Sequence, residues 1–226
     1  MGLRGPRPRR EEIVWTPDFA YAIGLIASDG CLSTDGRHFT LVSKDREQVL
    51  NIKKCLSITA NPSRRASGVN GDENYYYRLQ WGDIYLYNFL LSLGLTHNKS
   101  LSLGEIKVPD KYFFDFVRGS FDGDGCFYSY FDPRWKSSFM FYVTFTSGSH
   151  KHTEWLQKRI EGLCGIKGHI TRNSKAKHVT NLKYAKRESL LLLKLLYPSQ
   201  SVTHLTRKRL KIDQALSIVG MSLTVT

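Results

Sequence analysis

The sequence predicts an α+β fold of two αββαββα halves related by pseudo-twofold symmetry, each with a four-stranded antiparallel sheet. A nine-residue string occurs twice, as AIGLIASDG at 22–30 and VRGSFDGDG at 117–125, with Gly, an acid and Gly at matching places. Three features then follow each string in the same order: a strand ending in serine, a helix with a cysteine near its end, and an alternating strand before a Leu-rich helix. A shared order is harder to produce by chance than two similar strings, so we interpret the chain as a duplication.

The first half is expected to span residues 13–104, after a flexible basic N-terminus at 1–12. Its first helix covers 18–27, because Thr16 is a suitable N-cap and Pro17 is favoured at the first helical position. The remaining elements follow from strand alternation, turn residues and a terminating glycine. They are strands at 31–33 and 37–43 joined at Asp35-Gly36, a helix at 46–56, strands at 62–67 and 75–81 around Asn70-Gly71-Asp72, and a helix at 84–93 before Gly94.

The second half is expected to span residues 105–218 and to repeat this order, after a linker at about 101–110. Its elements are strands at 126–131, 138–146, 168–173 and 178–184, and helices at 151–163, 187–197 and 204–217. The last residues, 219–226, are expected to be loose, as chain ends commonly are.

The charge balance favours a polyanionic partner. The 226 residues include 33 Lys and Arg against 20 Asp and Glu, a formal charge of +13 carried by clusters along the whole chain. Distributed basic clusters on a folded chain are typical of nucleic-acid-binding proteins. No apolar run reaches the roughly 18 residues that span a bilayer, and no secretory signal is recognisable. We therefore expect no membrane association and an intracellular protein located with DNA, in the cytoplasm, the nucleoid or an organelle interior.

Two repeated acids, Asp29 and Asp124, lie at the C-terminal ends of apolar helices. A carboxylate there meets the unfavourable end of the helix dipole, and a bound cation is the usual reason to keep it. Gly24 and Gly119 have no side chains, so the two helices can cross with close backbones and bring the acids together. Paired carboxylates repel each other unless a cation lies between them, and oxygen ligands suit Mg²⁺. The pair therefore predicts a magnesium site that acts on phosphodiesters.

Strand alternation predicts one polar face on each sheet. Phe139, Phe141, Val143 and Phe145 share the inner face of one strand, and the residues between them share the outer face. The outer residues include Arg, Gln, Asn, Lys and Thr, the side chains that read base edges in a major groove. The residues expected to contact nucleic acid are Ser33, Arg37, His38, Thr40, Lys44, Arg64, Arg65, Arg78 and Gln80 in the first half, and Tyr128, Tyr130, Arg134, Lys136, Met140, Tyr142, Thr144, Thr146, Thr171, Asn173, Asn181 and Lys183 in the second.

The two strings resemble the LAGLIDADG motifs of homing endonucleases, in the monomeric form that carries two motifs. The resemblance covers about residues 13–218 and extends to the order of helices and hairpins. It implies a monomer that cleaves both strands of a long, asymmetric double-stranded DNA site by metal-dependent hydrolysis. The implied cofactor is Mg²⁺, with Mn²⁺ as a substitute and Ca²⁺ binding without supporting cleavage.

The resemblance also implies roles for individual residues. The metal-binding role falls on Asp29 and Asp124, with Gly30 and Ala27 as further residues of the metal site. The family places a polar residue, often Gln, at the end of the second strand, where this chain has Ser43 and Ser147. A basic residue after the last helix of each half corresponds to Lys99 and Lys208. Asp122 stands at a position that varies in the family and receives no catalytic role.

The alternative is a protein of the same fold that binds nucleic acid without cutting it, such as an intron RNA maturase or a regulator. RNA enters as a partner only under the maturase alternative. Non-cutting relatives can lose one or both acids, whereas this sequence keeps both. An intein is not expected, because the chain lacks the terminal residues of a splicing domain.

Overall fold

The computed structural model describes residues 12–66, 75–135, 137–172 and 178–223. The first half contains α1 (Pro17–Ser28), β1 (Gly30–Leu32), β2 (His38–Ser43), α2 (Arg46–Cys55), β3 (Ser63–Ala66), β4 (Tyr75–Gly82) and α3 (Ile84–Leu93). A 3₁₀ turn at Asp110–Tyr112 precedes the second half. That half contains α4 (Phe113–Asp124), β5 (Gly125–Phe131), β6 (Phe139–Ser147), α5 (His150–Cys164), β7 (His169–Arg172), β8 (Thr180–Ala185), α6 (Lys186–Leu196) and α7 (Thr206–Ile218).

The two sheets have the same topology, which confirms the predicted fold class. Their strand orders are β1-β2-β4-β3 and β5-β6-β8-β7, and every neighbouring pair is antiparallel. The registers also correspond, since Thr40 lies opposite Gln80 and Thr144 lies opposite Lys183. The predicted elements agree with the observed ones to within about two residues at their ends. The N-cap of α1 is as predicted, with the Thr16 hydroxyl accepting from the Phe19 N–H at 3.0 Å.

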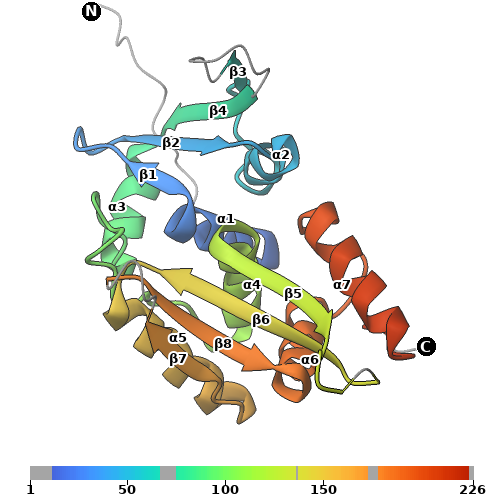
Figure 1. Ribbon diagram of the computed structural model, residues 1–226. Coiled ribbons are helices and arrows are strands. Elements are labelled where there is room, and N and C mark those ends of the chain that lie inside the picture. The colour runs from blue at the N-terminus through green and yellow to red at the C-terminus, as the bar shows by residue number, and fades with distance from the viewer. Residues whose placement is uncertain (1–11, 67–74, 136, 173–177, 224–226) are drawn as a thin grey trace, which may run out of the picture.

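Helices α1 and α4 lie side by side at the centre of the molecule, between the two sheets (Figure 1). Their backbones approach so closely because of two glycines. A Cβ on Gly119 would lie 2.0 Å from the Tyr21 carbonyl oxygen, and one on Gly24 would lie 2.1 Å from the Phe116 carbonyl oxygen. The predicted close crossing of the two glycine-bearing helices is therefore present, and it fixes the position of both C-terminal ends.

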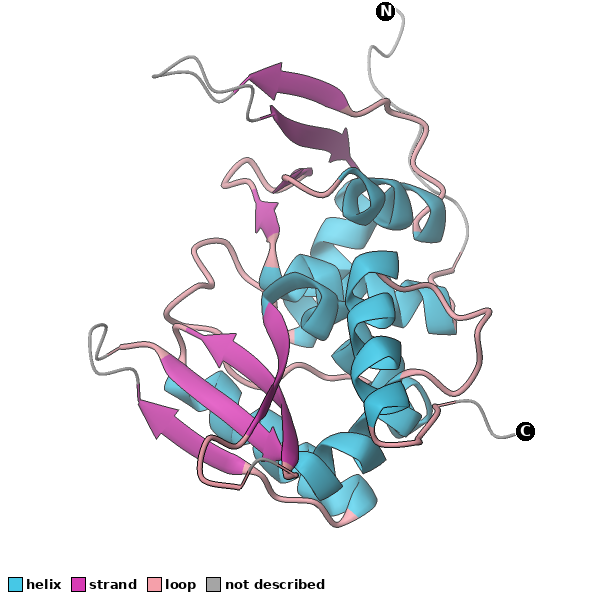
Figure 2. Cartoon of the chain, turned by 45° about the vertical axis from the view of Figure 1, so that its right-hand side comes forward, coloured by secondary structure: helices cyan, strands magenta, loops and turns pink. Residues whose placement is uncertain are grey.

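The inner faces of the sheets are those that strand alternation predicts. Phe39, Leu41 and Leu79 of the first sheet are fully buried, as are Phe141 and Val143 of the second. Apolar residues from both halves join in one continuous core cluster. Helices pack against the inner faces, so one face of each sheet stays free of helices (Figure 2).

The second half ends in a helix, α7, that has no counterpart among the described residues of the first half. Leu205 immediately precedes α7, and its N–H donates to Asp122 of α4 at 2.8 Å. Residues of the first half hold the same end: the N–H of Thr206 donates to Glu47 at 2.9 Å, and Asn51 donates to the His204 carbonyl oxygen at 2.9 Å. The helix is therefore bound to both halves.

The structure describes little of the N-terminal stretch but part of the C-terminal one. Most of the N-terminal stretch 1–12 lies outside the described residues. In the C-terminal stretch that was expected to be loose, Leu223 is only 4% exposed and belongs to the core cluster, so burial of its side chain anchors that segment. None of the described helices is long and apolar enough to cross a membrane.

Candidate functional site

The repeated acids lie where the C-terminal ends of α1 and α4 meet. Asp29 is the C-cap of α1, and Asp124 is the last residue of α4. A Cβ on Gly123 would come within 1.9 Å of the Ser28 hydroxyl oxygen and 3.0 Å of Asp29 Oδ2, so the two helix ends touch there. The structure thus brings together the two carboxylates that the motifs predicted to be neighbours.

The environment of Asp124 disfavours its ionised form. Burial is the main cause that raises the pKa of this carboxyl to about 6, and the negative charge of Asp29 raises it further. The positive charges of Lys99 and Lys208 act in the opposite direction without cancelling these effects. The two acids therefore interact electrostatically, as carboxylates of a shared cation site do.

The other acid, Asp29, forms a hydrogen bond with Gln48, a residue that no sequence pattern singled out. The side chain lies in the first turn of α2 and is only 3% exposed. Its amide nitrogen donates to Asp29 Oδ2, while its carbonyl oxygen accepts from the Ser43 hydroxyl at 2.6 Å. Ser43 therefore acts on Asp29 through Gln48. The carboxamide next to Asp29 thus comes from the helix that follows the strand.

The second half lacks this arrangement. The repeat places His152 of α5 at the position of Gln48. The His152 ring instead stacks on Trp155, with centroids 5.1 Å apart, and its Nδ1 lies 2.9 Å from the Gly104 carbonyl oxygen. Ser147 accepts from the Ser149 N–H at 3.0 Å and lines a pocket with Asp124. The two halves of the site are therefore chemically different.

We expect the buried His152 to make stability depend on pH. Burial lowers the pKa of its imidazole below the usual 6.5, so the folded state holds fewer protons than the unfolded state. Stability is then greatest above pH 6.5 and is lost as the pH falls through the folded pKa. His152→Gln, which restores the residue of the first half, should flatten this dependence. Urea denaturation midpoints between pH 5 and 8 measure it, and equal slopes in both proteins would contradict the assignment.

Lys99 follows α3 as expected, whereas Lys208 lies in the first turn of α7 and so does not follow the last helix of its half. Both lysines are buried close to the ends of α1 and α4, and their ammonium groups bind peptide carbonyls. Lys99 donates to the Gly30 carbonyl oxygen. Lys208 donates to the carbonyl oxygens of Phe121 at 2.5 Å and Gly125 at 2.6 Å. Burial lowers the pKa of Lys208 to about 8 and also lowers that of Lys99. Each lysine thus brings a positive charge to the negative end of one motif helix.

A pocket of about 280 Å³ opens beside Asp124. Its polar lining includes Lys99, Ser147, Thr146 and His178, and Ala27 forms part of its wall. The pocket places the carboxylate next to a space that a substrate group can enter. The carbonyl oxygen of Gly30 accepts from Lys99, so one of its two lone pairs is engaged.

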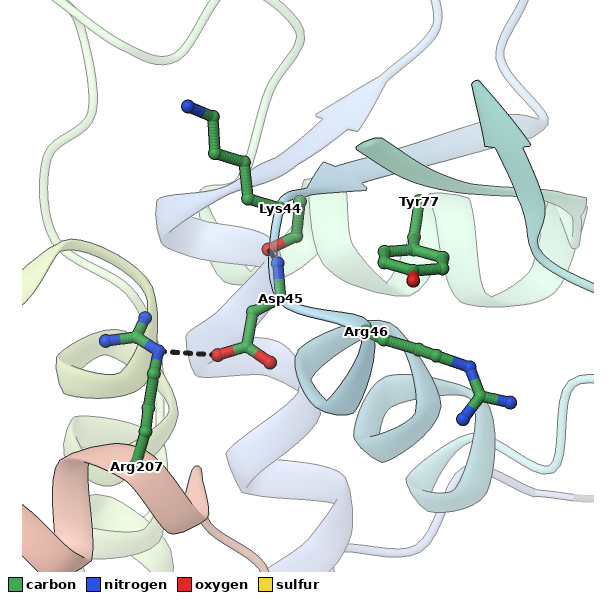
Figure 3. Close-up of a pocket in the computed structure, with 6 residues that line it drawn as sticks. Lys44, Asp45, Arg46, Tyr77 and Arg207 are labelled. Carbon is green, nitrogen blue, oxygen red and sulfur yellow. Dashed lines mark hydrogen bonds and ion pairs between the residues drawn. The ribbon is translucent and has the colours of Figure 1, made fainter. Parts of the chain in front are cut away.

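A second pocket, of about 450 Å³, lies on the first-half side, at the start of α2 and α7 (Figure 3). Arg207 forms an ion pair with Asp45 at 2.6 Å across it, while Lys44 and Arg46 extend away from that pair. Tyr77 and Ser43 complete the lining. This places three cationic side chains near the Ser43–Gln48–Asp29 chain of hydrogen bonds.

Asp122 has a structural position in the core. It is only 1% exposed, and its Oδ2 accepts from the Tyr21 hydroxyl at 2.7 Å and from the Leu205 N–H. Burial raises its pKa to about 6. The carboxyl joins α1, α4 and the start of α7, and it does not extend toward the paired acids' pocket.

The predicted nucleic-acid contacts lie mainly on the helix-free faces of the two sheets. Thr40 pairs with Gln80, Val42 pairs with Arg78, and Thr146 Oγ1 lies 2.8 Å from Asn181 Oδ1. By strand register, the side chains that share these faces are His38, Thr40, Arg65, Arg78 and Gln80 in the first sheet, and Tyr128, Tyr130, Met140, Tyr142, Thr144, Thr146, Thr171, Asn181 and Lys183 in the second. Ser33, Arg37, Lys44 and Arg134 lie in turns at the sheet ends.

Four of the residues expected to contact nucleic acid stand apart from the rest. Arg64 and Arg65 do not share a face, because neighbouring residues of a strand alternate; Arg64 lies over the Tyr75 ring, 3.4 Å from its centroid. Thr144 is only 9% exposed, so its side chain offers little contact surface. Lys136 and Asn173 lie outside the described residues.

The pair of acids fits a magnesium-type ion and not a closed protein cage. Among the described residues, no group of three or more His, Cys, Asp and Glu side chains could hold a metal. Mg²⁺ commonly binds through one or two carboxylates and takes its other ligands from water and substrate phosphates. Asp29 and Asp124 supply such a set, and Mn²⁺ accepts the same oxygen ligands.

Comparison with known proteins identifies the fold. No family profile and no curated protein sequence matches this chain. Among solved structures, the homing endonuclease I-WcaI bound to its DNA recognition sequence superposes with a TM-score of 0.63 at 13% identity, over 93% of this chain and 95% of that one. I-DmoI in complex with DNA and Mn gives a TM-score of 0.50 at 16% identity, over 81% and 98%.

Full-length DUF199/WhiA from Thermatoga maritima gives a TM-score of 0.57 at 12% identity. The alignment covers 94% of this chain but 64% of that protein, so this chain spans less than two thirds of its length. The chain therefore has the LAGLIDADG fold, which confirms the resemblance found in the two motifs. Identities this low identify the fold alone.

Proposed function

We propose that this protein is a metal-dependent, site-specific endonuclease that cleaves both strands of double-stranded DNA. The observation that carries the proposal is the meeting of Asp29 and Asp124 at the touching ends of α1 and α4, each end accompanied by a buried lysine. Two matched sets of an acid and a lysine provide one set for each strand of a duplex. Because one chain carries both sets, the enzyme acts as a monomer.

The two sheets support a duplex as the substrate. They stand on either side of the α1–α4 pair with their outer faces free of helices (Figure 1), and those faces carry Arg78, Gln80, Asn181 and Lys183. Such side chains read base edges, and the surplus of 13 positive charges favours the phosphate backbone. The faces differ in sequence, so the preferred DNA site is asymmetric. The endonucleases I-WcaI and I-DmoI, which share the fold, were solved with DNA.

The residues of the site have distinct roles in the proposed hydrolysis. A divalent cation held by the acids supplies activation of the attacking water and stabilisation of the leaving oxygen. Gln48 orients Asp29 by donating to one of its oxygens, so that the other oxygen is left for the cation. Lys99 and Lys208 keep positive charge beside the two acids, which stabilises the charge that develops on a scissile phosphate.

A cleavage assay on a randomised duplex pool tests the proposal. The protein is incubated with the pool in Mg²⁺, in Mn²⁺ and in Ca²⁺, and the cut ends are sequenced. We expect one asymmetric motif among fragments cut in Mg²⁺ or Mn²⁺, and binding without cutting in Ca²⁺. Selective binding without cutting in any of the three ions would favour the alternative, a nucleic-acid-binding protein. A parallel pool of structured RNA tests the maturase form of that alternative.

One observation gives the non-cutting alternative weight: the ammonium groups of both lysines are engaged with peptide carbonyls. Lys99→Ala and Lys208→Ala separate the two roles. Under the nuclease proposal, each variant slows the chemical step more than it weakens DNA binding. Each also lowers the free energy of unfolding by about 1–3 kcal/mol, because buried carbonyls lose their donor.

Single-turnover kinetics at saturating protein measure the chemical step, and urea denaturation measures the stability. Lys211→Ala is the control, since Lys211 is an exposed lysine of α7, the helix that contains Lys208. Loss of stability with an unchanged cleavage rate in both lysine variants would assign these residues to the fold alone.

A further inference from the structure

The outer face of the second sheet carries three nearly parallel tyrosine rings. Tyr142 of β6 stacks with Tyr128 of β5, with centroids 5.0 Å apart and ring planes 16° apart. Tyr142 also stacks with Tyr130, with centroids 6.1 Å apart and planes 11° apart. Tyr142 thus belongs to both pairs, and the three rings form one cluster, which we call the tyrosine stack.

A lysine of the adjacent strand holds this stack. Lys183 Nζ of β8 lies 4.5 Å from the centroid of the Tyr142 ring and 5.1 Å from that of Tyr128. A cation over aromatic rings is attracted by the negative charge on their faces. The ring faces of Tyr142 and Tyr128 are therefore engaged within the protein, and the stack is ordered before any ligand arrives. What it offers to a ligand is exposed aromatic surface, with Tyr130 42% exposed, together with the hydroxyl groups.

The first sheet carries a different chemistry on its outer face. There Arg78 donates to the side-chain oxygen of Gln80 at 3.2 Å, and the face is built from guanidinium and amide groups that form hydrogen bonds with base edges. The second face carries the tyrosine stack beside threonine, asparagine and lysine side chains, and Met140, which lies opposite Tyr130, adds an apolar side chain to the stack. The two faces of this pseudo-symmetric protein therefore select different features of a duplex.

The major groove presents one prominent apolar group, the C5-methyl group of thymine. The arrangement of the stack disfavours the use of Tyr142 for stacking on an unpaired base, which is the other common role of aromatic side chains. Such stacking needs a free ring face, and Tyr142 packs against Tyr128 and Tyr130 and has Lys183 Nζ 4.5 Å from its centroid. The phenols of the stack are neutral at neutral pH, as tyrosine side chains ordinarily are.

We propose that Tyr128, Tyr130 and Tyr142, held in place by Lys183, form a site that recognises C5-methyl groups of pyrimidines in the major groove of one half of a duplex DNA target. The inference rests on the duplex binding proposed above and adds the chemistry by which one half-site is selected. It predicts thymines at the positions under the tyrosine stack. Cytosines placed there should bind more tightly when they carry a 5-methyl group.

A double-mutant cycle between protein and DNA tests the inference. The best-bound duplex is first selected from a random pool in EDTA, so that cleavage plays no part. Each thymine is then replaced singly by deoxyuridine, which differs only by the missing methyl group, and dissociation constants are measured by fluorescence anisotropy. We expect substitutions in one half-site to weaken binding by about fourfold per methyl group, and those in the other half-site to have little effect.

Variants of the protein locate the effect. With Tyr142→Ala, thymine and uracil should bind equally at the sensitive positions, whereas Tyr142→Phe, which keeps the ring, should retain the preference. Tyr85→Ala is the matched control, because Tyr85 is an exposed tyrosine on α3, away from both sheets. Circular dichroism confirms that each variant is folded.

The outcomes are distinguishable from those of the proposed nuclease activity. If a duplex is selected but uracil binds as well as thymine throughout, the inference is wrong while duplex binding stands. If the preference persists in Tyr142→Ala, the methyl groups are read elsewhere. If single strands compete better than the duplex, or no duplex is selected, the duplex proposal and this inference both fail.

Discussion

Asp29→Asn and Asp124→Asn are each expected to abolish double-strand cleavage while leaving DNA binding within about tenfold of wild type. The amide keeps the shape of the side chain but loses the negative charge that a divalent cation requires. Binding depends mainly on the broad basic surface and is little affected by one site residue. These carboxylates lie at the joined ends of α1 and α4, so neither can take over the position of the other.

The measurement is single-turnover cleavage of a duplex whose two strands carry different labels, with binding measured separately in Ca²⁺. Asp110→Asn is the control, because Asp110 is an exposed acid outside the site, paired only with Arg159 in a surface ion pair at 2.7 Å. Double-strand breaks at the wild-type rate in either site variant would show that the metal site is assigned wrongly. A loss of binding as large as the loss of cleavage would instead point to a role in the fold.

Gly119→Ala is expected to cause the largest loss of stability of any single methyl addition in the chain's centre, at least about 3 kcal/mol of unfolding free energy. The added Cβ would lie 2.0 Å from the Tyr21 carbonyl oxygen, a distance that no Cβ tolerates, and 3.0 Å from the Leu25 nitrogen. Both neighbours are backbone atoms of α1, so no side-chain rotation relieves the clash. The helices must separate, and their packed neighbours must move with them.

Gly162→Ala provides a matched control, since Gly162 lies within α5 and a Cβ there would meet nothing within 4 Å. That substitution should raise stability by about 0.4–1 kcal/mol, because alanine restricts the unfolded chain. Gly24→Ala approaches the same contact from the other helix and should resemble Gly119→Ala. Urea denaturation of the three variants measures the difference. Equal midpoints for Gly119→Ala and Gly162→Ala would mean that the helices do not cross at this glycine.

Local pattern predicted most of the fold. Strand alternation identified the buried Phe141 and Val143, and the repeated glycines indicated the close contact between α1 and α4. These features depend on residues near each other in the chain or on an explicit repeat. The burial of Leu223 could not be predicted, because it depends on packing against distant elements, which the composition of its own segment does not reveal.

The candidate site was predicted only in part, because some of its residues come together only through packing of distant elements. The acids are marked by the repeat, but Gln48 is brought to Asp29 only by the packing of α2 against α1. A weak signal was present: Gln48 shares the buried side of α2 with Val49 and Ile52, where an amide needs a polar partner. For Arg64, in contrast, the sequence was sufficient: strand alternation alone places its side chain and that of Arg65 on opposite faces of β3.

The anchoring of α7 has a consequence for exchanging halves between proteins of this fold. The N-terminal end of this second-half helix is held by acids of the first half, through the Thr206 N–H to Glu47 at 2.9 Å and through the Arg207–Asp45 ion pair at 2.6 Å. A chimera cut in the linker near residue 104 keeps the crossing of α1 and α4 but separates α7 from these acceptors. The transferable module therefore includes the first turn of α2 together with the start of α7, and a successful graft must carry both.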